Sequence, residues 1–313
     1  MGELSVREGY GRALAKYGEV NPNVVVLDPD TSGSTFTHFF SERFPERFFN
    51  IGIAEPCMVD VAVGLALGGK VPFANGFAAL ITLRAMEQVR TCVCYARTNV
   101  KLVGHFAGLS DFKDGPTHHS ITDLANMRAM PELTVIVPAD AAEAAQWVPI
   151  IADYDGPVYL RISRASALPA YQEGTPLTIG KGIILREGSD LTLVAIGSMV
   201  GRTLVAAENL AQKGVHARVL EIHTLKPLDR DLILQAAEET GALVTAEEHS
   251  ILGGLGSAVA ETLSTCRPTI LERVGIADTF ARTAFTPEIL MDAFGLSVQD
   301  IELAAQRALA RKS

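Results

Sequence analysis

The chain has 313 residues, of which 48% are hydrophobic and 20% charged, so its composition supports packed cores and excludes a disordered protein. The formal net charge is -9 with no basic patch, which excludes binding to nucleic acid through its phosphates. No apolar run is long enough to cross a bilayer, and no basic stretch and apolar core open the chain, so we expect a cytoplasmic protein without membrane contact.

Short β-branched runs alternate with helix-length segments along the first half. The expected strands are residues 24–28, 100–104, 134–137 and 158–162, and the expected helices are residues 59–67, 85–96 and 141–152. This alternation predicts a mostly parallel sheet with helices on both faces.

The pattern stops between residues 165 and 180, where Pro169, Gly174 and Pro176 interrupt any periodicity. It then resumes, with strands expected at residues 191–196, 217–222, 242–246 and 270–271 and helices at residues 203–213 and 232–240. We therefore predict an α/β protein of two domains, each a mostly parallel sheet flanked by helices. Their predicted extents are residues 1–166 and 182–313, joined by a linker at residues 167–181.

The apolar segment 48–55 ends on a single carboxylate, Glu55, just before a helix-like run. Thiamine diphosphate catalysis requires such a desolvated glutamate, which hydrogen-bonds the aminopyrimidine ring and favours its reactive tautomer. The alternative is that Glu55 stabilises the start of the helix near Pro56. From these residues alone both interpretations remain open.

Residues 111–119 form a polar loop with Gly115 and Pro116 that follows a predicted strand, where open α/β sheets present ligands. Asp114 and His118 in this loop could bind substrate hydroxyls or move protons. An ordinary turn with exposed histidines is the alternative.

Three arginines are candidates for binding a phosphate. Arg161 and Arg164 end the strand at residues 158–162, and Arg7 precedes a helical pattern. A guanidinium binds phosphate in a fork and keeps its charge. The alternative for each is a solvated surface group.

Gly253, Gly254 and Gly256 follow a predicted strand and open a helix, which suggests a nicotinamide dinucleotide site. Val259 stands where the third glycine of that fingerprint belongs, so close packing of helix on strand explains these glycines better. The Gly-Asp-Gly motif with which thiamine diphosphate enzymes hold metal and diphosphate is absent. A thiamine function would therefore need a second chain.

Eight segments together resemble one family. They are residues 47–55, 69–77, 84–90, 114–118, 135–140, 156–164, 224–229 and 247–259. The chain resembles the C-terminal part of a transketolase, and most closely the small subunit of a split, two-chain transketolase. The resemblance implies a thiamine diphosphate pyrimidine-binding domain followed by a transketolase C-terminal domain.

The resemblance also implies the roles of individual residues. It makes Glu55 and His118 catalytic, although His118 could equally bind hydroxyls only. The implied cofactor-binding residues are Glu55, Phe77 and Asp30. The implied substrate-binding residues are Arg7, Ser34, Asp114, His118 and Arg164.

The implied enzyme moves a two-carbon ketol unit from a ketose phosphate to an aldose. It would be active only with a large subunit that carries the diphosphate-binding domain and supplies the ligands of Mg²⁺ and diphosphate, so this chain would have no metal ligands. A hetero-tetramer is the expected assembly.

Three departures from the family pattern concern the substrate. Phe106 stands where the family usually has a phosphate-binding His, with His105 displaced by one position. Leu80 replaces a usual aromatic residue, and Pro56-Cys57 replaces a common Gln-Asn pair. These changes favour a non-standard or branched sugar phosphate. The alternatives are the β subunit of a 2-oxoacid dehydrogenase, a deoxyxylulose phosphate synthase-like enzyme, and a noncatalytic scaffolding subunit.

Overall fold

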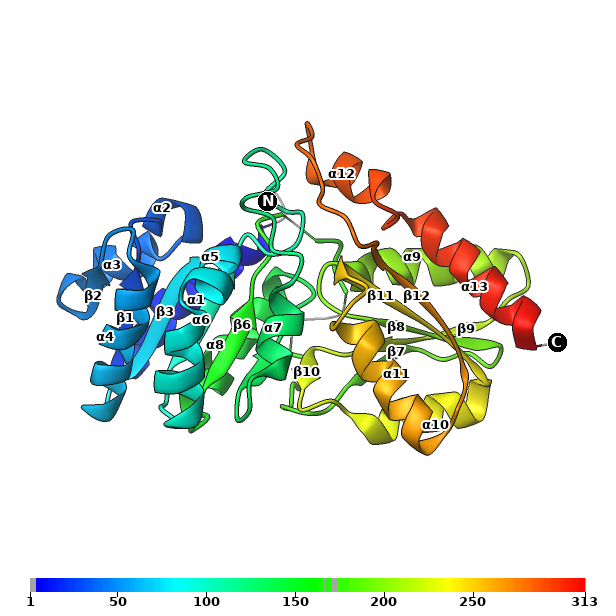
Figure 1. Cartoon of the computed structure of the whole chain (residues 1–313), viewed down its shortest axis with the longest axis horizontal. Coiled ribbons are helices and arrows are strands. Elements are labelled where there is room, and N and C mark those ends of the chain that lie inside the picture. The colour runs from blue at the N-terminus through cyan, green and yellow to red at the C-terminus, as the bar shows by residue number, and fades with distance from the viewer. Residues whose placement is uncertain (1–3, 166, 171–173, 313) are drawn as a thin grey trace.

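The structure is a computed structural model that describes residues 4–165, 167–170 and 174–312. Two α/β units lie side by side in it (Figure 1), and the predicted fold class is confirmed. The predicted boundary at residue 166 and residues 171–173 of the predicted linker lie outside the described residues. The described part of the linker contains neither helix nor strand, and its assignment as a linker stays a prediction.

The first sheet has seven strands in the order β10-β5-β6-β4-β3-β1-β2. Their bounds are β1 (Val24–Asp28), β2 (Phe48–Asn50), β3 (Val71–Phe77), β4 (Lys101–His105), β5 (Thr134–Ile136), β6 (Val158–Arg161) and β10 (Thr224–Lys226). All neighbours run parallel except β10 and β5, which are antiparallel. The strand β10 comes from the predicted C-terminal domain, so the second half of the chain completes the first sheet.

Helices cover both faces of this sheet. On one face lie α1 (Val6–Val20) and α8 (Ala141–Asp153), whose Tyr10, Leu14 and Trp147 are fully buried. The other face carries α4 (Glu55–Leu67), α5 (Ala78–Arg84), α6 (Met86–Gln88), the π-helix η2 (Val89–Tyr95) and α7 (Asp123–Ala129). The short α2 (Ser32–Thr35), α3 (His38–Arg43) and 3-10 helix η1 (Pro45–Arg47) connect β1 to β2.

The second sheet has five strands in the order β12-β11-β8-β9-β7. They are β7 (Ile183–Arg186), β8 (Leu191–Ala195), β9 (Ala217–Glu221), β11 (Ala242–Ser250) and β12 (Ile270–Ile276), and only β7 is antiparallel to its neighbour. One face is covered by α9 (Met199–Gln212), α12 (Pro287–Ala293) and α13 (Val298–Lys312). The other carries α10 (Arg230–Thr240) and α11 (Leu255–Cys266).

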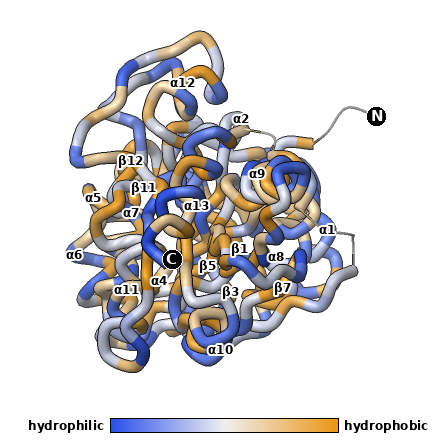
Figure 2. The backbone as a smooth tube through the Cα atoms, turned by 90° about the vertical axis from the view of Figure 1, so that its right-hand side faces the viewer, coloured by the Kyte–Doolittle hydropathy of each residue, from blue (hydrophilic) through white to orange (hydrophobic). Residues whose placement is uncertain are grey.

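A single apolar cluster runs through both units. It contains Met58 on α4 and Val135 on β5 of the first unit. It continues through Leu225 on β10 to Leu220 and Val259 of the second unit. Figure 2 shows the hydrophobic residues gathered around the strands, while the outer sides of α10 and α13 are hydrophilic. The two units therefore share part of one core.

Several predicted elements need correction. Residues 85–96 are not one α-helix, because the chain passes from α6 into the π-helix η2. Arg7 does not precede the first helix but lies inside α1. The strand β3 was not predicted, because Pro72, Asn75 and Gly76 are residues that strands disfavour.

Candidate active site

Glu55 is buried at the first residue of α4. The chain leaves β2 and turns at Gly52, whose φ of +76° suits glycine, before the helix begins. Only 1% of Glu55 is exposed, and its Oε2 accepts a hydrogen bond of 2.7 Å from Nη1 of Arg84 on α5. Among the described residues no hydrogen bond to its Oε1 is found, and its carboxylate does not cap its own helix. The carboxylate thus has one oxygen available to a ligand.

Phe106 stands directly after β4 with a φ of +60°, a backbone conformation that is uncommon for a bulky residue. Its ring centroid lies 5.1 Å from Cζ of Arg7 and 5.0 Å from Cζ of Arg164. Both distances are within the roughly 6 Å at which a cation is attracted to an aromatic face. The ring of Phe77, at the end of β3, lies 4.5 Å from that of Phe106. The Phe106 ring therefore lies against two guanidinium groups and against Phe77.

The two arginines are fixed from different sides. Nη1 of Arg7 donates to the backbone oxygen of Ser34 at 2.6 Å, and Nη1 of Arg164 donates to Oδ1 of Asp111 at 2.8 Å. Burial, and then the nearby Arg164 charge, lower the pKa of Arg7. Two like charges held this close make the site attractive to an anion.

Asp111 is a site residue to which no role was assigned from the sequence. It is fully buried, and its Oδ2 has no hydrogen-bond partner among the described residues. Burial, and then the Asp114 carboxylate, raise the pKa of Asp111 to about 6. Its position at the start of the polar loop was visible in the sequence, but its burial against Arg164 was not.

The other predicted loop residues lie nearer the surface. His118 is half-buried, with its ring centroid 5.9 Å from that of Phe77, and its Nδ1 lies 3.0 Å from Oγ1 of Thr117. Asp114 is exposed. Both are thus positioned to meet a ligand that enters from solvent.

Asp30 and its neighbours form a structured turn after β1. Asp30 is exposed, has a φ of +69°, and its Oδ1 accepts from Nδ2 of Asn50 at 3.0 Å. Behind it Asp28 is fully buried and accepts hydrogen bonds from the hydroxyls of Thr31, Thr35 and Thr37. Asp28 was not predicted as a site residue, although it shapes the segment that carries Asp30 and Ser34.

His105 cannot replace the missing family histidine. It is fully buried, and its Nε2 lies 3.1 Å from Oδ1 of Asn75, which also accepts from the Tyr10 hydroxyl at 2.8 Å. Burial, and then the Arg7 charge, lower the pKa of His105 to about 3. It is therefore a neutral residue behind the site.

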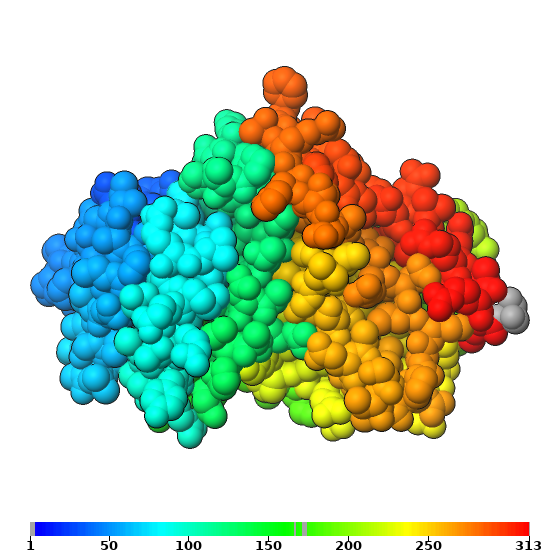
Figure 3. Space-filling view, viewed as in Figure 1, coloured from blue at the N-terminus to red at the C-terminus, as the bar shows by residue number. Residues whose placement is uncertain are grey.

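The second unit supports the polar loop. Oε1 of Glu248, on β11, accepts from the backbone N of Leu109 at 2.7 Å, and Ser198 donates to its Oε2. The backbone N of Ala284 donates to the oxygen of Phe112 at 3.0 Å. Figure 3 shows this contact as the green loop against the orange segment at the top of the molecule. Glu248 was also missed, since nothing in the sequence links it to a loop so distant along the chain.

Two other predicted candidates have structural roles. Arg161 is 5% exposed and its Nε donates to Oδ2 of Asp123 at 2.7 Å, so it is not available to a phosphate. At the start of α11, the backbone N groups of Leu255 and Gly256 donate to the Glu247 carboxylate at 2.7 and 2.8 Å. A side chain of the protein thus occupies the place where a dinucleotide phosphate would bind, which argues against the nicotinamide alternative.

The predicted site residues divide into one linked group and two separate ones. Phe106 and Asp111 link Arg7, Ser34, Phe77, His118 and Arg164. No hydrogen bond, ion pair or ring contact among the described residues joins Glu55 or Asp30 to that group, whereas Asp114 is linked to it through Asp111, whose pKa it raises. Apart from Arg7, which lies in α1 ahead of the first strand and reaches Ser34 and Phe106, these residues end or follow strands of one sheet at its carboxyl edge, where open α/β sheets bind ligands. In addition, none of the described helices is long and apolar enough to cross a membrane.

Comparison with known proteins gives the following matches. Residues 2–168 match the family model of the transketolase pyrimidine-binding domain, and residues 180–301 match that of the transketolase C-terminal domain. The chain is 41% identical to the 6-deoxy-6-sulfo-D-fructose transketolase subunit SqwH of Clostridium sp. (strain MSTE9), covering 98% of this chain and 95% of that protein. It is 36% identical to one of the subunits of an apulose-4-phosphate transketolase from Phocaeicola vulgatus, with 88% of each chain covered. A solved structure described as a split gene transketolase, inactive beta4 tetramer, superposes with a TM-score of 0.92 at 45% identity, covering 99% of this chain and all of that one.

Proposed function

Because this chain belongs to the transketolase family, we propose that it is the small, pyrimidine-binding subunit of a split transketolase that moves a two-carbon ketol unit from an anionic ketose to an aldose. The observation that carries the proposal is the buried Glu55 at the same sheet edge as Phe77 and the two guanidinium groups. An activating acid and an anion site are the two features that such a reaction requires of this half of the pocket.

The residues present fit thiamine diphosphate. Glu55 is buried and has an oxygen free of hydrogen bonds among the described residues, as an acid that bonds the aminopyrimidine needs. We assign Phe77 to the wall against that ring and Asp30 to its border. When bound, the cofactor supplies the carbon nucleophile and electron sink for cleavage of the ketose carbon–carbon bond.

The protein residues then bind and orient the substrate. Arg7, Arg164 and the Ser34 segment hold the terminal anionic group, while Asp114 and His118 bind sugar hydroxyls. His118 can also transfer a proton, because an imidazole has both a donor and an acceptor nitrogen.

A separate large subunit is proposed to hold Mg²⁺ and the diphosphate, since this chain has no Gly-Asp-Gly motif. Exposed apolar side chains near Glu55 support such a partner, because Ile53 is 76% and Leu83 60% exposed on segments next to it. We propose a hetero-tetramer in which each active site lies between two chains, and in which this chain alone is inactive.

The terminal group of the ketose is proposed to be a phosphate or a sulfonate, on a chain that is branched or otherwise non-standard. The names of two relatives specify 6-deoxy-6-sulfo-D-fructose and apulose 4-phosphate. Phe106 lies between Arg7 and Arg164 and cannot donate a hydrogen bond as a histidine would. The anion would therefore be selected by its charge and shape.

The test uses the chain co-purified with its large partner, thiamine diphosphate and Mg²⁺. Ketoses with terminal phosphate or sulfonate, branched and unbranched, are offered with an aldose, and the product two carbons longer is measured. Glu55→Gln should lower kcat by about a hundredfold or more, because an acid–base contribution of roughly 10²–10⁴ is lost.

The control is Glu46→Gln, at a glutamate whose side chain is 68% exposed, and it should keep full activity. If the complex with Glu55→Gln transfers ketol units at the normal rate, the proposed catalytic function is wrong, and a scaffolding role replaces it.

A further inference from the structure

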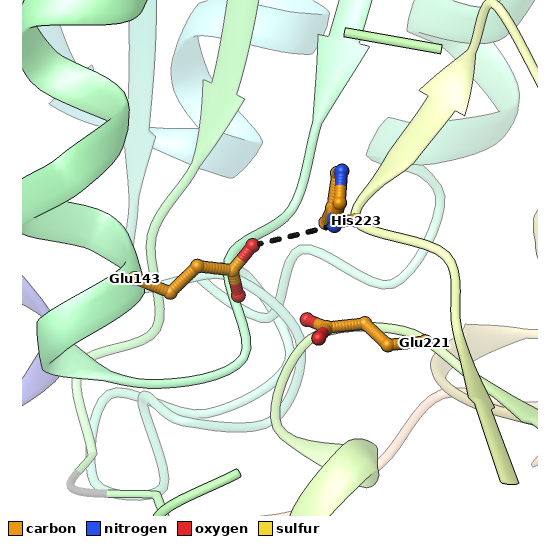
Figure 4. Close-up of side chains that lie close together, drawn as sticks. All are labelled: Glu143, Glu221 and His223. Atoms are coloured by element: carbon orange, nitrogen blue, oxygen red, sulfur yellow. Dashed lines mark ion pairs between the residues drawn. The ribbon is translucent and has the colours of Figure 1, made fainter. Parts of the chain in front are cut away.

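The side chains of Glu143, Glu221 and His223 meet between the two units. His223 precedes β10, at one end of the first sheet, whereas Glu55 follows β2, at the other end. Glu143 lies in the first turn of α8, Glu221 ends β9, and His223 precedes β10. All three are fully buried. Figure 4 shows the side chains pointing toward one another, with Nδ1 of His223 3.8 Å from Oε1 of Glu143. The two units thus contribute different members of one buried polar cluster.

The cluster contains donor atoms that the rest of the protein leaves unused. Both carboxylate oxygens of Glu221 and the Nδ1 of His223 have no hydrogen-bond partner among the described residues. The Nε2 of His223 lies 3.3 Å from the backbone oxygen of Thr178. If Nε2 carries the hydrogen of that bond, the lone pair is on Nδ1, the atom that faces the carboxylates.

Glu143 is held in place but keeps coordinating capacity. Its Oε1 accepts from Nε1 of Trp147 at 2.9 Å, and its Oε2 accepts from the backbone N of Ala139 at 2.5 Å. Each carboxylate oxygen has a second lone pair, so both remain able to bind a cation. These hydrogen bonds fix the orientation of the carboxylate, as outer partners of metal ligands do.

Charge gives an independent reason for a ligand. Two buried carboxylates face each other, and no lysine or arginine of the described residues forms a salt bridge with either. An uncompensated buried charge is strongly unfavourable, so burial, and then the Glu143 carboxylate, raise the pKa of Glu221, and without a cation the pair keeps a proton. A divalent cation would balance both carboxylates at once.

We propose that Glu143, Glu221 and His223 bind one divalent cation that joins the two units of the chain. One ligand atom from each residue already lies within 4.8 Å of the others, so a small inward movement reaches metal–ligand distances of about 2 Å. The two free oxygens of Glu221 suit bidentate binding, which gives four donor atoms. Imidazole with carboxylates favours Zn²⁺, Mn²⁺ or Fe²⁺.

The site goes beyond the proposed transferase function and does not depend on it. It is also separate from the Mg²⁺ that the cofactor would require, because the two glutamates and the histidine are buried in this chain. Its readouts are metal content and stability, so its failure leaves the Glu55 experiment unaffected.

The experiment uses the untagged full-length chain, stripped with a chelator and titrated with Co²⁺ as a spectroscopic probe. The proposal expects visible absorption bands that saturate at about one equivalent, displacement by Zn²⁺, and a higher Tm with metal than without. Glu221→Gln and His223→Gln should each abolish the bands and the metal-dependent rise in Tm. Glu46→Gln, at an exposed glutamate, is the matched control and should retain both.

Absence of a saturable Co²⁺ band in the wild-type chain would overturn the proposal, even if the variants fail to fold. A Glu221→Gln chain that is as stable as the wild type with and without metal would also overturn it. Either result would mean that the two carboxylates share a proton instead.

Discussion

At the scale of the residue, Phe106 sets the character of the proposed anion site. A histidine at this position could donate a hydrogen bond to an anion, whereas the Phe106 ring only attracts the guanidinium groups of Arg7 and Arg164. In the proposed function this site therefore binds its anion through two positioned charges. This favours recognition by charge over recognition by a defined set of hydrogen bonds.

Phe106→Leu should weaken binding of the anionic substrate. Each cation–π contact contributes about 0.5–1 kcal/mol, so loss of both should raise KM for an anionic ketose roughly tenfold and change kcat less. Steady-state kinetics of the two-chain complex measures this. Phe285→Leu, at a ring that is 92% exposed, is the control, and an equal effect of both variants would contradict the assignment.

Asp111 should make stability depend on pH in an identifiable window. Its pKa of about 6 in the folded chain exceeds the ordinary 3.8, so the folded state binds more protons than the unfolded state between these values. The contribution of Asp111 to the free energy of unfolding therefore falls as pH rises from about 4 to 6 and stays low above that. Urea unfolding across this range should show the fall in the wild type and a flatter profile in Asp111→Asn. Asp278→Asn, at an exposed carboxylate, should leave the slope unchanged.

The sequence predicts the environment of a single residue when its type and its neighbours are compatible with few environments. Glu55 after an apolar run predicted a buried acid, and it is buried. Arg84 and Asp111 could not be assigned, because their roles depend on partners 29 and 53 positions away in the chain. The assigned functions of all these residues stay predictions.

At the scale of the element, the start of α11 is built around Glu247. Its carboxylate accepts hydrogen bonds from the first amides of the helix, which a bound phosphate would accept in a nucleotide site. Gly254 makes this possible, because a Cβ there would lie 1.9 Å from Oε2 of Glu247. The glycine-rich sequence thus serves an internal cap.

Gly254→Ala should lower the free energy of unfolding by about 1–3 kcal/mol, as overpacking typically does. Gly64→Ala in α4 is the matched control, since its Cβ would meet nothing within 4 Å. That change should stabilise the chain by up to about 1 kcal/mol through helix propensity. Urea denaturation measures both, and equal effects would contradict the packing argument.

Elements with a regular pattern were predictable, and those set by tertiary context were not. The runs at residues 24–28 and 158–162 became buried parallel strands because they are continuous and β-branched. The strand β10 has three residues, and it is a strand only because β5 offers it an edge. The change from α6 to a π-helix likewise has no signal in the sequence.

At the scale of the whole molecule, the shared apolar cluster and β10 couple the two units. Val135 and Leu225 belong to the same cluster as Val259 of the second unit, so neither unit buries its surface alone. The prediction of two sheets was correct, but it did not anticipate this common core. The linker assignment at residues 167–181 does not conflict with it, because the coupling includes residues 220–226 and the hydrogen bond between Leu109 and Glu248, which lie outside the linker.

The two units should therefore unfold in one cooperative transition. Trp147 is the single tryptophan and is fully buried in the first unit, whereas far-ultraviolet circular dichroism reports on both. Urea curves from its fluorescence and from circular dichroism should coincide. Two separated transitions would show that the units are independent.

The position of β10 also affects how the chain folds while it is being translated. The strand β5 can pair with its outer neighbour, β10, only after residues 224–226 have been translated. No earlier strand of the first sheet pairs with β5 on that side. Until then a nascent chain presents an unpaired strand edge, which is prone to join other polypeptides. Molecular chaperones that shield such edges would therefore matter most during translation of the residues between β6 and β10.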